Sequence, residues 1–442
     1  MPTQGATQFG GPGRMPAVLV SVATSVVPRG EREERIQEMR RLADSAGLVI
    51  VGEMFQLRES PDPRCFVGSG KLGDLEALRR ESGAHIVLFD AELSPVQIRN
   101  IENSVGGRAV DRTGLILDLF ARRARTAEGK LQVELAQLLY ALPRLTGRGA
   151  SMSRLGGGVG TRGPGETKLE VDRRSIRRRI GLLRREIESL RARRETQRAR
   201  RRSVPHPVIA LVGYTNSGKS TLFNALTSAE VHAEDRLFAT LDPTVRALRL
   251  PSGQAALLVD TVGFIRDLPH ELVAAFRATL EEVSEADVLV HVVDAANPSH
   301  PAQMEAATSV LRSLGAAGKP TVTAFNKCDL HRPAESALAQ YRPAEAISAL
   351  TGEGLTGLLR RVDECLARDR TEVTLSLPYS RQSLLPLIHD NGRVIGVQYE
   401  GEEIVVRAEL PRVWAKRLES ALQGAGVGGM HGKTSEGPRP TA

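Results

Sequence analysis

The chain has 442 residues and a formal net charge of +8, and aromatic residues make up only 4% of it. This length exceeds what one hydrophobic core serves and indicates about three domains. The basic excess favours a polyanionic partner, nucleic acid first, whereas the scarcity of aromatic residues disfavours RNA binding by base stacking. Cys65, Cys328 and Cys365 form no C-x-x-C pair, so neither a disulfide scaffold nor a zinc site is indicated. No apolar run approaches the roughly 18 residues of a membrane span, and we expect a cytoplasmic protein.

The N-terminal part of the chain predicts a tail followed by a small domain. Residues 1–16 are rich in glycine and proline and predict a disordered tail. Over residues 17–123, apolar strands alternate with charged helices, which predicts a parallel α/β domain. Residues 68–71 (Gly-Ser-Gly-Lys) resemble a phosphate-binding loop but lack its first glycine. We therefore interpret them as the turn that starts a helix rather than as a second nucleotide site.

Residues 124–203 predict an antiparallel helical hairpin. Two segments repeat apolar residues at alternating spacings of four and three: Leu131, Leu135, Leu138 and Leu142, then Ile176, Ile180, Leu183, Ile187 and Leu190. The glycine-rich loop between them carries Arg148, Arg154 and Arg162. Because glycines allow close approach and arginines suit phosphates, we predict that this tip loop contacts RNA. Residues 173–202 carry too few acids to balance their arginines, which favours phosphate contact over simple solvation.

A complete phosphate-binding motif, G-x-x-x-x-G-K-[ST], occupies residues 213–220. It follows the apolar run 208–212, which reads as a buried strand, and it precedes the start of a helix. This context is the required one, because N–H groups of the loop and of the helix N-terminus surround the phosphates. Lys219 would reach the β- and γ-phosphates, and the hydroxyl of Ser220 would ligate Mg²⁺.

An N-K-x-D tetrapeptide begins at Asn326, at the end of another buried strand. Asp329 would accept two hydrogen bonds from the N1–H and the exocyclic amine of guanine, which adenine cannot supply. Asn326 would tie this segment to the phosphate loop, and the stem of Lys327 would cover the base. The backbone N–H of Ala349 would reach the guanine O6. These features predict a guanine nucleotide.

Two further segments would sense the γ-phosphate. Asp260 begins a D-x-x-G motif and would hold Mg²⁺ through water, while the N–H of Gly263 would meet the γ-phosphate. Thr240 would complete the Mg²⁺ shell; Thr244 is the competing candidate, and loop geometry favours Thr240. Such segments order when triphosphate is bound and relax after hydrolysis, so the site would act as a switch.

Phe264 departs from a common GTPase pattern. Many such enzymes place glutamine directly after the D-x-x-G glycine to orient the attacking water. A phenylalanine ring cannot hydrogen-bond a water molecule. We therefore predict that intrinsic hydrolysis is slow and needs a partner.

Together, these segments give the predicted site for GTP as substrate and GDP as product. Its nucleotide-binding residues are Gly213, Tyr214, Thr215, Asn216, Ser217, Gly218, Lys219, Ser220, Thr221, Phe238, Ala239, Thr240, Leu241, Asp242, Asp260, Thr261, Val262, Gly263, Asn326, Lys327, Cys328, Asp329, Ser348, Ala349 and Leu350. Lys219, Thr240 and Gly263 are the predicted catalytic residues. Mg²⁺ would be held by Ser220 and Thr240 directly and by Asp260 through water.

The rest of the chain completes an α/β fold class. Residues 204–370 predict a doubly wound P-loop GTPase domain, with the ligand at the carboxyl ends of the strands. Residues 371–423 predict a small C-terminal α+β domain, in which Trp414 is expected to be a core residue. Residues 424–442 predict a second disordered tail.

In four segments the chain resembles the HflX-type GTPases, bacterial relatives of the Obg group of translation GTPases. These segments are 111–118 (DRTGLILD), 129–138 (GKLQVELAQL), 160–167 (GTRGPGET) and 263–269 (GFIRDLP). The resemblance implies a GTPase that binds the large ribosomal subunit and acts in ribosome splitting, rescue or biogenesis. It also implies that the N-terminal domain and the hairpin tip contact ribosomal RNA. Phe264 fits the family pattern, whereas Ser217 stands where relatives usually have alanine.

Two other functions compete with this prediction. One is an RNA-remodelling ATPase, which the N-K-x-D segment disfavours, and nothing in the chain resembles paired helicase domains. The other is an RNA-binding scaffold with a structural nucleotide, which would bind its particle equally well with GTP or GDP. We expect a monomer.

Overall fold

The computed structural model describes residues 14–24, 27–145, 168–201, 206–227, 238, 243–266, 282–367, 370–401 and 403–423. The described chain forms an α/β protein, as predicted, and divides into two compact units. The first unit consists of Met1–Leu190, Glu234–Asp242 and Arg266–Ala278, and the second of Arg191–Ala233, Pro243–Ile265 and Thr279–Ala442. Most of both predicted tails and the hairpin tip, with Arg148, Arg154 and Arg162, lie outside the described residues.

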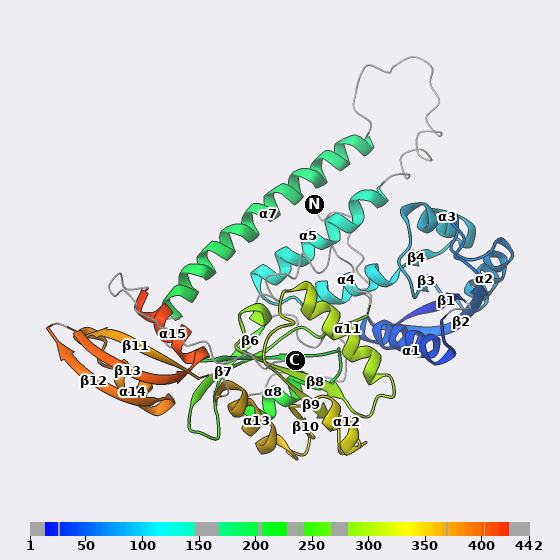
Figure 1. Ribbon diagram of the computed structural model, residues 1–442. Coiled ribbons are helices and arrows are strands. Elements are labelled where there is room, and N and C mark those ends of the chain that lie inside the picture. The colour runs from blue at the N-terminus through cyan, green and yellow to red at the C-terminus, as the bar shows by residue number, and fades with distance from the viewer. Residues whose placement is uncertain are drawn as a thin grey trace, which may run out of the picture. The chain divides into compact units, whose positions relative to one another are not determined.

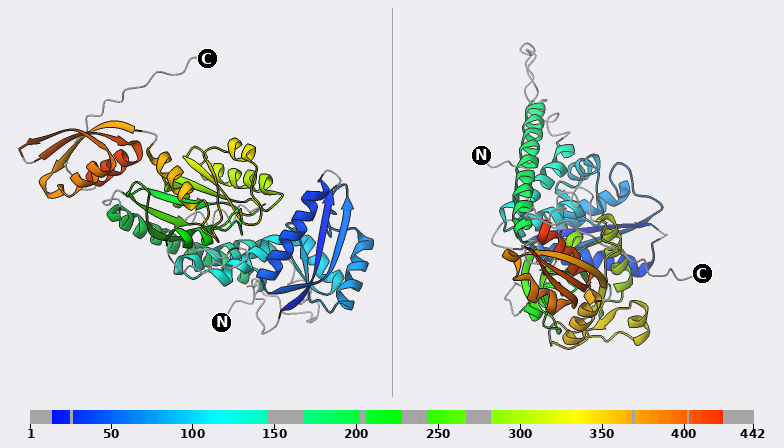
Figure 2. Two further views of the ribbon diagram at one scale, coloured as in Figure 1. Left: turned by 90° about the horizontal axis from the view of Figure 1, so that it is seen from below. Right: turned by 60° about the vertical axis from the view of Figure 1, so that its left-hand side comes forward.

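The first unit contains a four-stranded parallel sheet in the order β2-β1-β3-β4. Its strands are β1 (Met15–Thr24), β2 (Leu48–Arg58), β3 (Ile86–Phe89) and β4 (Arg108–Val110). The helices that connect and extend it are α1 (Arg29–Ser45), α2 (Ser69–Glu81), α3 (Pro95–Val105) and α4 (Arg112–Arg123). Apolar side chains of α2 and α3 pack on one face of the sheet, and α1 lies on the other (Figure 2). Because helices cover both faces, β3 is buried at every position.

The segment that resembles a second phosphate loop starts a helix. Gly68 precedes the first residue of α2, and its backbone N–H donates to Gln56 Oε1 at 3.0 Å. An added Cβ at Gly68 would lie 2.5 Å from the guanidinium of Arg58. A side chain of the same domain therefore fills the space in front of this turn.

Helices α5 (Ala127–Arg144) and α7 (Lys168–Arg201) form the arms of the hairpin, and they lie side by side (Figure 1). The apolar repeats meet in one cluster around Leu135, Ile180 and Leu183. Arg179 also forms a bidentate salt bridge with Glu134, with N···O distances of 2.7 and 2.8 Å. The periodic leucine and isoleucine seam thus pairs the two helices, as its spacing predicts.

Asp111 joins the root of this hairpin to the sheet domain. Its fully buried carboxylate caps α4 by accepting from the N–H of Gly114 at 2.7 Å. It also accepts from the hydroxyl of Tyr140 at 2.6 Å and from Arg144 at 3.0 Å, both near the end of α5. The backbone N–H of Leu93 supplies a fourth bond at 3.2 Å. Burial and the neighbouring Asp111 charge raise the pKa of Tyr140, so its hydroxyl stays a proton donor.

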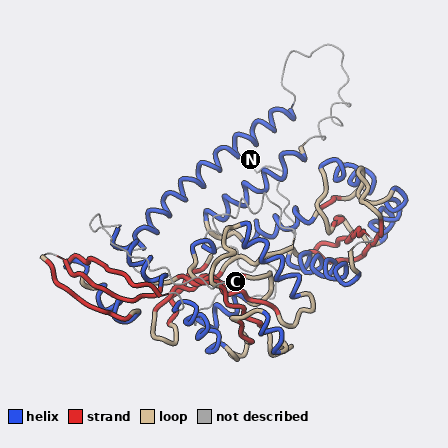
Figure 3. The backbone as a smooth tube through the Cα atoms, in the orientation of Figure 1, coloured by secondary structure: helices blue, strands red, loops and turns tan. Residues whose placement is uncertain are grey.

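The second unit contains a six-stranded sheet in the order β10-β9-β8-β5-β7-β6. Figure 3 colours the strands of the protein red and its helices blue. Its strands are β5 (Val208–Val212), β6 (Thr244–Arg249), β7 (Ala255–Asp260), β8 (Val288–Asp294), β9 (Thr321–Asn326) and β10 (Ala344–Ala346). The helices described here are α8 (Lys219–Thr227), α11 (His300–Ser313), α12 (Glu335–Gln340) and α13 (Leu355–Ala367). All strands pair in parallel except β6, which runs antiparallel to β7 at the edge.

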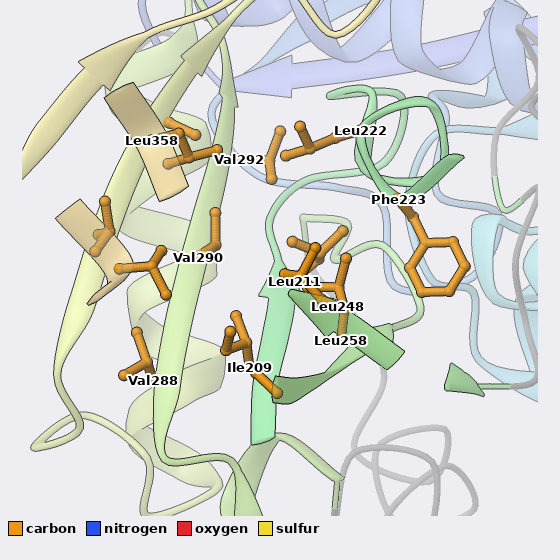
Figure 4. Close-up of a cluster of buried hydrophobic side chains, with 14 of the residues drawn as sticks. Ile209, Leu211, Leu222, Phe223, Leu248, Leu258, Val288, Val290, Val292 and Leu358 are labelled. Carbon is orange, nitrogen blue, oxygen red and sulfur yellow. The ribbon is translucent and has the colours of Figure 1, made fainter. Parts of the chain in front are cut away.

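Helices pack against both faces of this sheet, which gives the sheet its doubly wound form. Side chains of β5, β7 and β8 meet those of α8 and α13 on one face, around Leu211, Phe223 and Leu358 (Figure 4). On the other face, α11 and α12 pack around Phe325. With both faces covered, the carboxyl ends of the parallel strands are the free edge at which functional loops gather.

The C-terminal part of the second unit is a small α+β module. Its antiparallel sheet has the order β11-β13-β12, with β11 (Arg370–Pro378), β12 (Arg393–Glu400) and β13 (Glu403–Pro411). A single 3₁₀ turn (Tyr379–Arg381) leads into α14 (Leu384–Asn391), and α15 (Arg412–Gln423) ends the described chain. Trp414 lies in the core beneath this sheet, as expected. Within the described residues, no helix is both long and apolar enough to span a membrane.

We predict that Asp111→Ala lowers the free energy of unfolding by about 3–5 kcal/mol, because it leaves Arg144 partly buried without its anion and removes a helix cap. Urea denaturation of the full chain measures this. Thr126→Ala, which removes the cap of α5 at Gly129, serves as the control and should cost about 1 kcal/mol. If Asp111→Ala lowers the free energy of unfolding by less than Thr126→Ala does, the role given to Asp111 is contradicted.

Candidate functional site: a phosphate-binding loop

The loop between β5 and α8 depends on two glycines. Gly213 has φ 147°, and an added Cβ would lie 2.2 Å from the carbonyl oxygen of Val292. Gly218 has φ 92°, and an added Cβ would lie 2.2 Å from the amide nitrogen of Asn326. Any side chain would therefore clash at both positions. The loop can take this shape only with the glycines of the motif in place.

Lys219 begins α8 and is buried beneath the loop. Its ammonium donates to the carbonyl oxygens of Gly213 at 3.1 Å and Tyr214 at 2.7 Å, so the cation is held by loop dipoles. Burial lowers the pKa of Lys219 to about 8, and the charge of Asp260 opposes this shift. An approaching anion stabilises a buried cation of this kind, because the anion replaces the hydration that the cation lost on burial.

Ser220 and Asp260 supply oxygen atoms next to this cation. The Ser220 hydroxyl donates to Asp260 Oδ2 at 2.8 Å, and Asp260 is fully buried at the end of β7. Hard oxygen donors suit Mg²⁺, which commonly takes one or two protein ligands and completes its shell with phosphates and water. Nowhere in the described chain do three or more His, Cys, Asp or Glu side chains gather as a metal cluster. The donor set fits a magnesium ion shared with a bound phosphate.

The D-x-x-G segment lies directly against the loop. An added Cβ at Gly263 would meet the Cα of Thr215 at 2.8 Å and the ammonium of Lys219 at 2.9 Å. The N–H of Phe264 donates to Gly213 O at 2.9 Å, and the N–H of Thr215 donates to Phe264 O at 2.7 Å. The Phe264 ring is buried and has no hydrogen-bonding group to offer to a water molecule. Sequence reasoning missed this backbone bridge.

Asn326 connects the N-K-x-D segment to two other loops. Its amide nitrogen donates to Ser217 O at 2.8 Å, and its Oδ1 accepts from the N–H of Ala349 at 2.9 Å. The hydroxyl of Ser348 donates to Asp329 Oδ1 at 2.6 Å. Lys327 has φ 67° and pairs with Asp294 at 2.7 Å. The Ala349 N–H, which we expected to face guanine O6, is bonded to Asn326 in this structure.

The remaining predicted residues fall in three groups. Ala239, Thr240, Leu241 and Asp242 lie outside the described residues, so the Mg²⁺ role of Thr240 stays a prediction. Thr244, the competing candidate, begins β6 and pairs in register with Asp260. Phe238 has φ 58° and belongs to the first unit, where its ring packs edge-on against Phe120 of α4 at 4.6 Å between centroids.

The sequence analysis left Arg266 without a role. It follows the D-x-x-G motif by three residues and belongs to the first unit. Its guanidinium pairs with Glu31 and Glu34 of α1, at 3.2 Å each, and its carbonyl accepts from Arg112 at 3.0 Å. Arg266 and Glu31 are 235 residues apart in sequence, so no local pattern could have joined them.

Four family models match successive parts of the chain. They are described as "GTP-binding GTPase N-terminal" (residues 33–121), "GTP-binding GTPase Middle Region" (123–201), "50S ribosome-binding GTPase" (208–327) and "HflX C-terminal domain" (336–427). The order of these models follows the order of the segments described above.

Full-length relatives agree with the family models. The GTPase HflX of Caldanaerobacter subterraneus is 45% identical over 92% of this chain and 93% of its own length. That of Escherichia coli K12 is 45% identical over 78% of this chain and 82% of its own. A crystal structure of a GTP-binding protein from Sulfolobus solfataricus with GDP is 26% identical, with a TM-score of 0.44 over 79% of this chain and 98% of that chain. With identity this high over most of both bacterial chains, the present chain belongs to the HflX family of GTPases.

Proposed function

We propose that this GTPase is a nucleotide-controlled switch that binds the large ribosomal subunit and acts in ribosome splitting, rescue or biogenesis. One observation carries the nucleotide part of the proposal. The phosphate loop, the D-x-x-G segment and the N-K-x-D segment are joined by direct bonds from Phe264 to Gly213, from Ser220 to Asp260, and from Asn326 to Ser217. These three bonds bring every described nucleotide motif to one edge of the sheet, where doubly wound folds bind ligands.

The phosphate end of the site follows from these contacts. Lys219 would exchange its two carbonyl partners for oxygens of the β- and γ-phosphates. Ser220 and Thr240 would hold Mg²⁺ directly, and Asp260 would hold it through water. When bound, Mg²⁺ would neutralise charge that develops on the phosphate oxygens. The N–H of Gly263 would meet the γ-phosphate and so distinguish GTP from GDP.

The base end of the site would select guanine. Asp329 is exposed, with one carboxylate oxygen held by Ser348, and is available to accept from N1–H and the exocyclic amine. The stem of Lys327 would cover the ring. For Ala349 to bind O6, its N–H must turn from Asn326 or share the bond. We expect this exchange when guanine enters.

Hydrolysis by the isolated chain would be slow. Phe264, in the position that commonly carries the water-orienting glutamine, is buried and lacks a hydrogen-bonding group. A bound ribosomal particle would have to complete or order the water-binding site. GTP would therefore stay unhydrolysed until the protein binds the ribosomal particle.

Basic segments outside the sheet support an RNA partner. The matching family model for residues 208–327 is described as a 50S ribosome-binding GTPase. The hairpin tip carries Arg148, Arg154 and Arg162. Exposed arginines continue along α7, for example Arg177 and Arg184. Guanidinium groups pair with phosphates in a two-pronged geometry, which makes ribosomal RNA the expected contact.

We predict that Lys219→Ala abolishes GTP and GDP binding in the micromolar range, because the phosphates lose their buried cation. Titration with a fluorescent guanine nucleotide measures this. Arg249→Ala removes an exposed cation of β6 and should leave affinity unchanged. Micromolar binding by the Lys219 variant would refute the assignment of this loop.

We also predict that Asp329→Asn shifts preference from GTP toward XTP, since an amide can donate to the extra carbonyl oxygen of xanthine. Competition of both nucleotides against a fluorescent probe measures the ratio of affinities. Asp390→Asn, at an exposed carboxylate of α14, is the matched control. An unchanged GTP/XTP ratio would exclude Asp329 from base recognition.

Replacing Arg148, Arg154 and Arg162 together with alanine should weaken binding to purified large subunits but leave GTP affinity unchanged. Co-sedimentation in the presence of a non-hydrolysable GTP analogue tests this. A variant with the exposed Arg312, Arg332 and Arg393 of the second unit replaced by alanine controls for the lost charge. Equal sedimentation of the tip variant and this control would remove the proposed role of the tip.

A further inference from the structure

Thr215 carries a buried hydroxyl in the phosphate loop. The residue is only 7% exposed, and its backbone N–H donates to Phe264 O at 2.7 Å. The side-chain Oγ1, in contrast, has no hydrogen-bond partner among the described residues. Burying a hydroxyl that makes no hydrogen bond costs free energy. Valine has nearly the same shape and would avoid this cost, so the structure of the loop alone does not account for a threonine at this position.

Thr215 lies against the two groups that would meet the γ-phosphate. A Cβ added to Gly263 would lie 2.8 Å from the Cα of Thr215 and 2.9 Å from its methyl carbon Cγ2. The same point is 2.9 Å from the ammonium of Lys219. The phosphate loop, the D-x-x-G segment and the first residue of α8 therefore converge there. Because rotation about the Cα–Cβ bond exchanges the methyl and hydroxyl positions, the hydroxyl of Thr215 can face this point.

The chemistry at this point favours a phosphate oxygen. An ammonium and a backbone N–H are donors, and a hydroxyl can donate as well. Phosphate oxygens are charged acceptors, which form stronger hydrogen bonds than neutral ones. Ser217 Oγ is also buried without a partner in the described part of the chain. It lies 3.3 Å from the Cβ that Gly213 would carry, a point 2.2 Å from Val292 O. That point lies at β8, whereas Thr215 contacts the D-x-x-G segment.

We propose that the Thr215 hydroxyl donates a hydrogen bond to a γ-phosphate oxygen of GTP and thereby helps the site to discriminate GTP from GDP. The inference rests on the proposed position of the γ-phosphate, between the Lys219 ammonium and the Gly263 N–H. GDP lacks the γ-phosphate, so this bond forms only with the triphosphate. Phe264, the residue after Gly263, has no side-chain group that can hydrogen-bond. The Thr215 hydroxyl therefore adds a side-chain contact that the D-x-x-G segment does not supply.

The test compares two substitutions in the full chain, Thr215→Val, which removes the hydroxyl at nearly constant shape, and Thr215→Ser, which keeps it. Thr215→Val should weaken binding of a β,γ-imido GTP analogue on the order of tenfold, because a hydrogen bond to a charged group is lost. Its GDP affinity should stay unchanged. Thr215→Ser should bind both nucleotides as the parent chain does. The matched control is Thr323→Val, at a threonine of β9 that is also 7% exposed and lies outside the site.

Thermal unfolding of the nucleotide-free chain separates this role from a structural one. Thr215→Val should unfold at the same temperature as the parent chain or higher, because it removes a buried hydroxyl that lacks a hydrogen bond. The proposal is supported if Thr215→Val loses affinity for the GTP analogue alone, while Thr215→Ser and Thr323→Val lose none.

The proposal is overturned if Thr215→Val weakens both nucleotides equally, with or without a lower unfolding temperature, or weakens neither. It is also overturned if kcat for GTP hydrolysis falls while both affinities hold, which would place the hydroxyl at the attacking water. Failure of the parent chain to bind either nucleotide would instead reject the proposed nucleotide site.

Discussion

A single buried ammonium group constrains the nucleotide-binding part of this molecule. Lys219 is held under the phosphate loop by the carbonyls of Gly213 and Tyr214, and burial lowers its pKa to about 8. Backbone dipoles only partly replace its lost hydration, so a phosphate is its natural partner. Gly218 admits Asn326 into contact with the same loop, and Gly263 comes within reach of the Lys219 ammonium. The motifs therefore depend on one another, because at Gly218 and Gly263 any side chain would collide with a residue of another motif.

How far the sequence predicted this site depends on whether a feature is local. The strand, loop and helix around Lys219 form one continuous segment, and their pattern predicts both structure and position. The hairpin was likewise predictable, because a period of three and four residues defines one face of each helix. In contrast, β6 was not expected as an antiparallel edge strand, since its short run gives no sign of direction. The bridge between Thr215 and Phe264 joins backbone atoms, which leave no trace in residue types.

Long-range polar networks were the hardest to foresee. Asp111 caps α4, and it also accepts hydrogen bonds from Tyr140 and Arg144, which no local pattern indicates. Arg266 stands in a segment that resembles the family, but its partners in α1 lie more than two hundred positions away. Such pairings follow from the packing of whole elements and not from neighbouring residues.

We propose that the chain uses its two kinds of cation for different tasks: a buried lysine as a point charge at the phosphates of GTP, and exposed arginines of the hairpin as planar groups at RNA phosphates. We infer that the nucleotide bound at Lys219 governs how the arginines engage the ribosome. The most direct measurement is the equilibrium affinity for purified large subunits with a non-hydrolysable GTP analogue, with GDP and without nucleotide. We expect the tightest binding with the GTP analogue, by about tenfold or more over GDP. Equal affinity in all three conditions would contradict it.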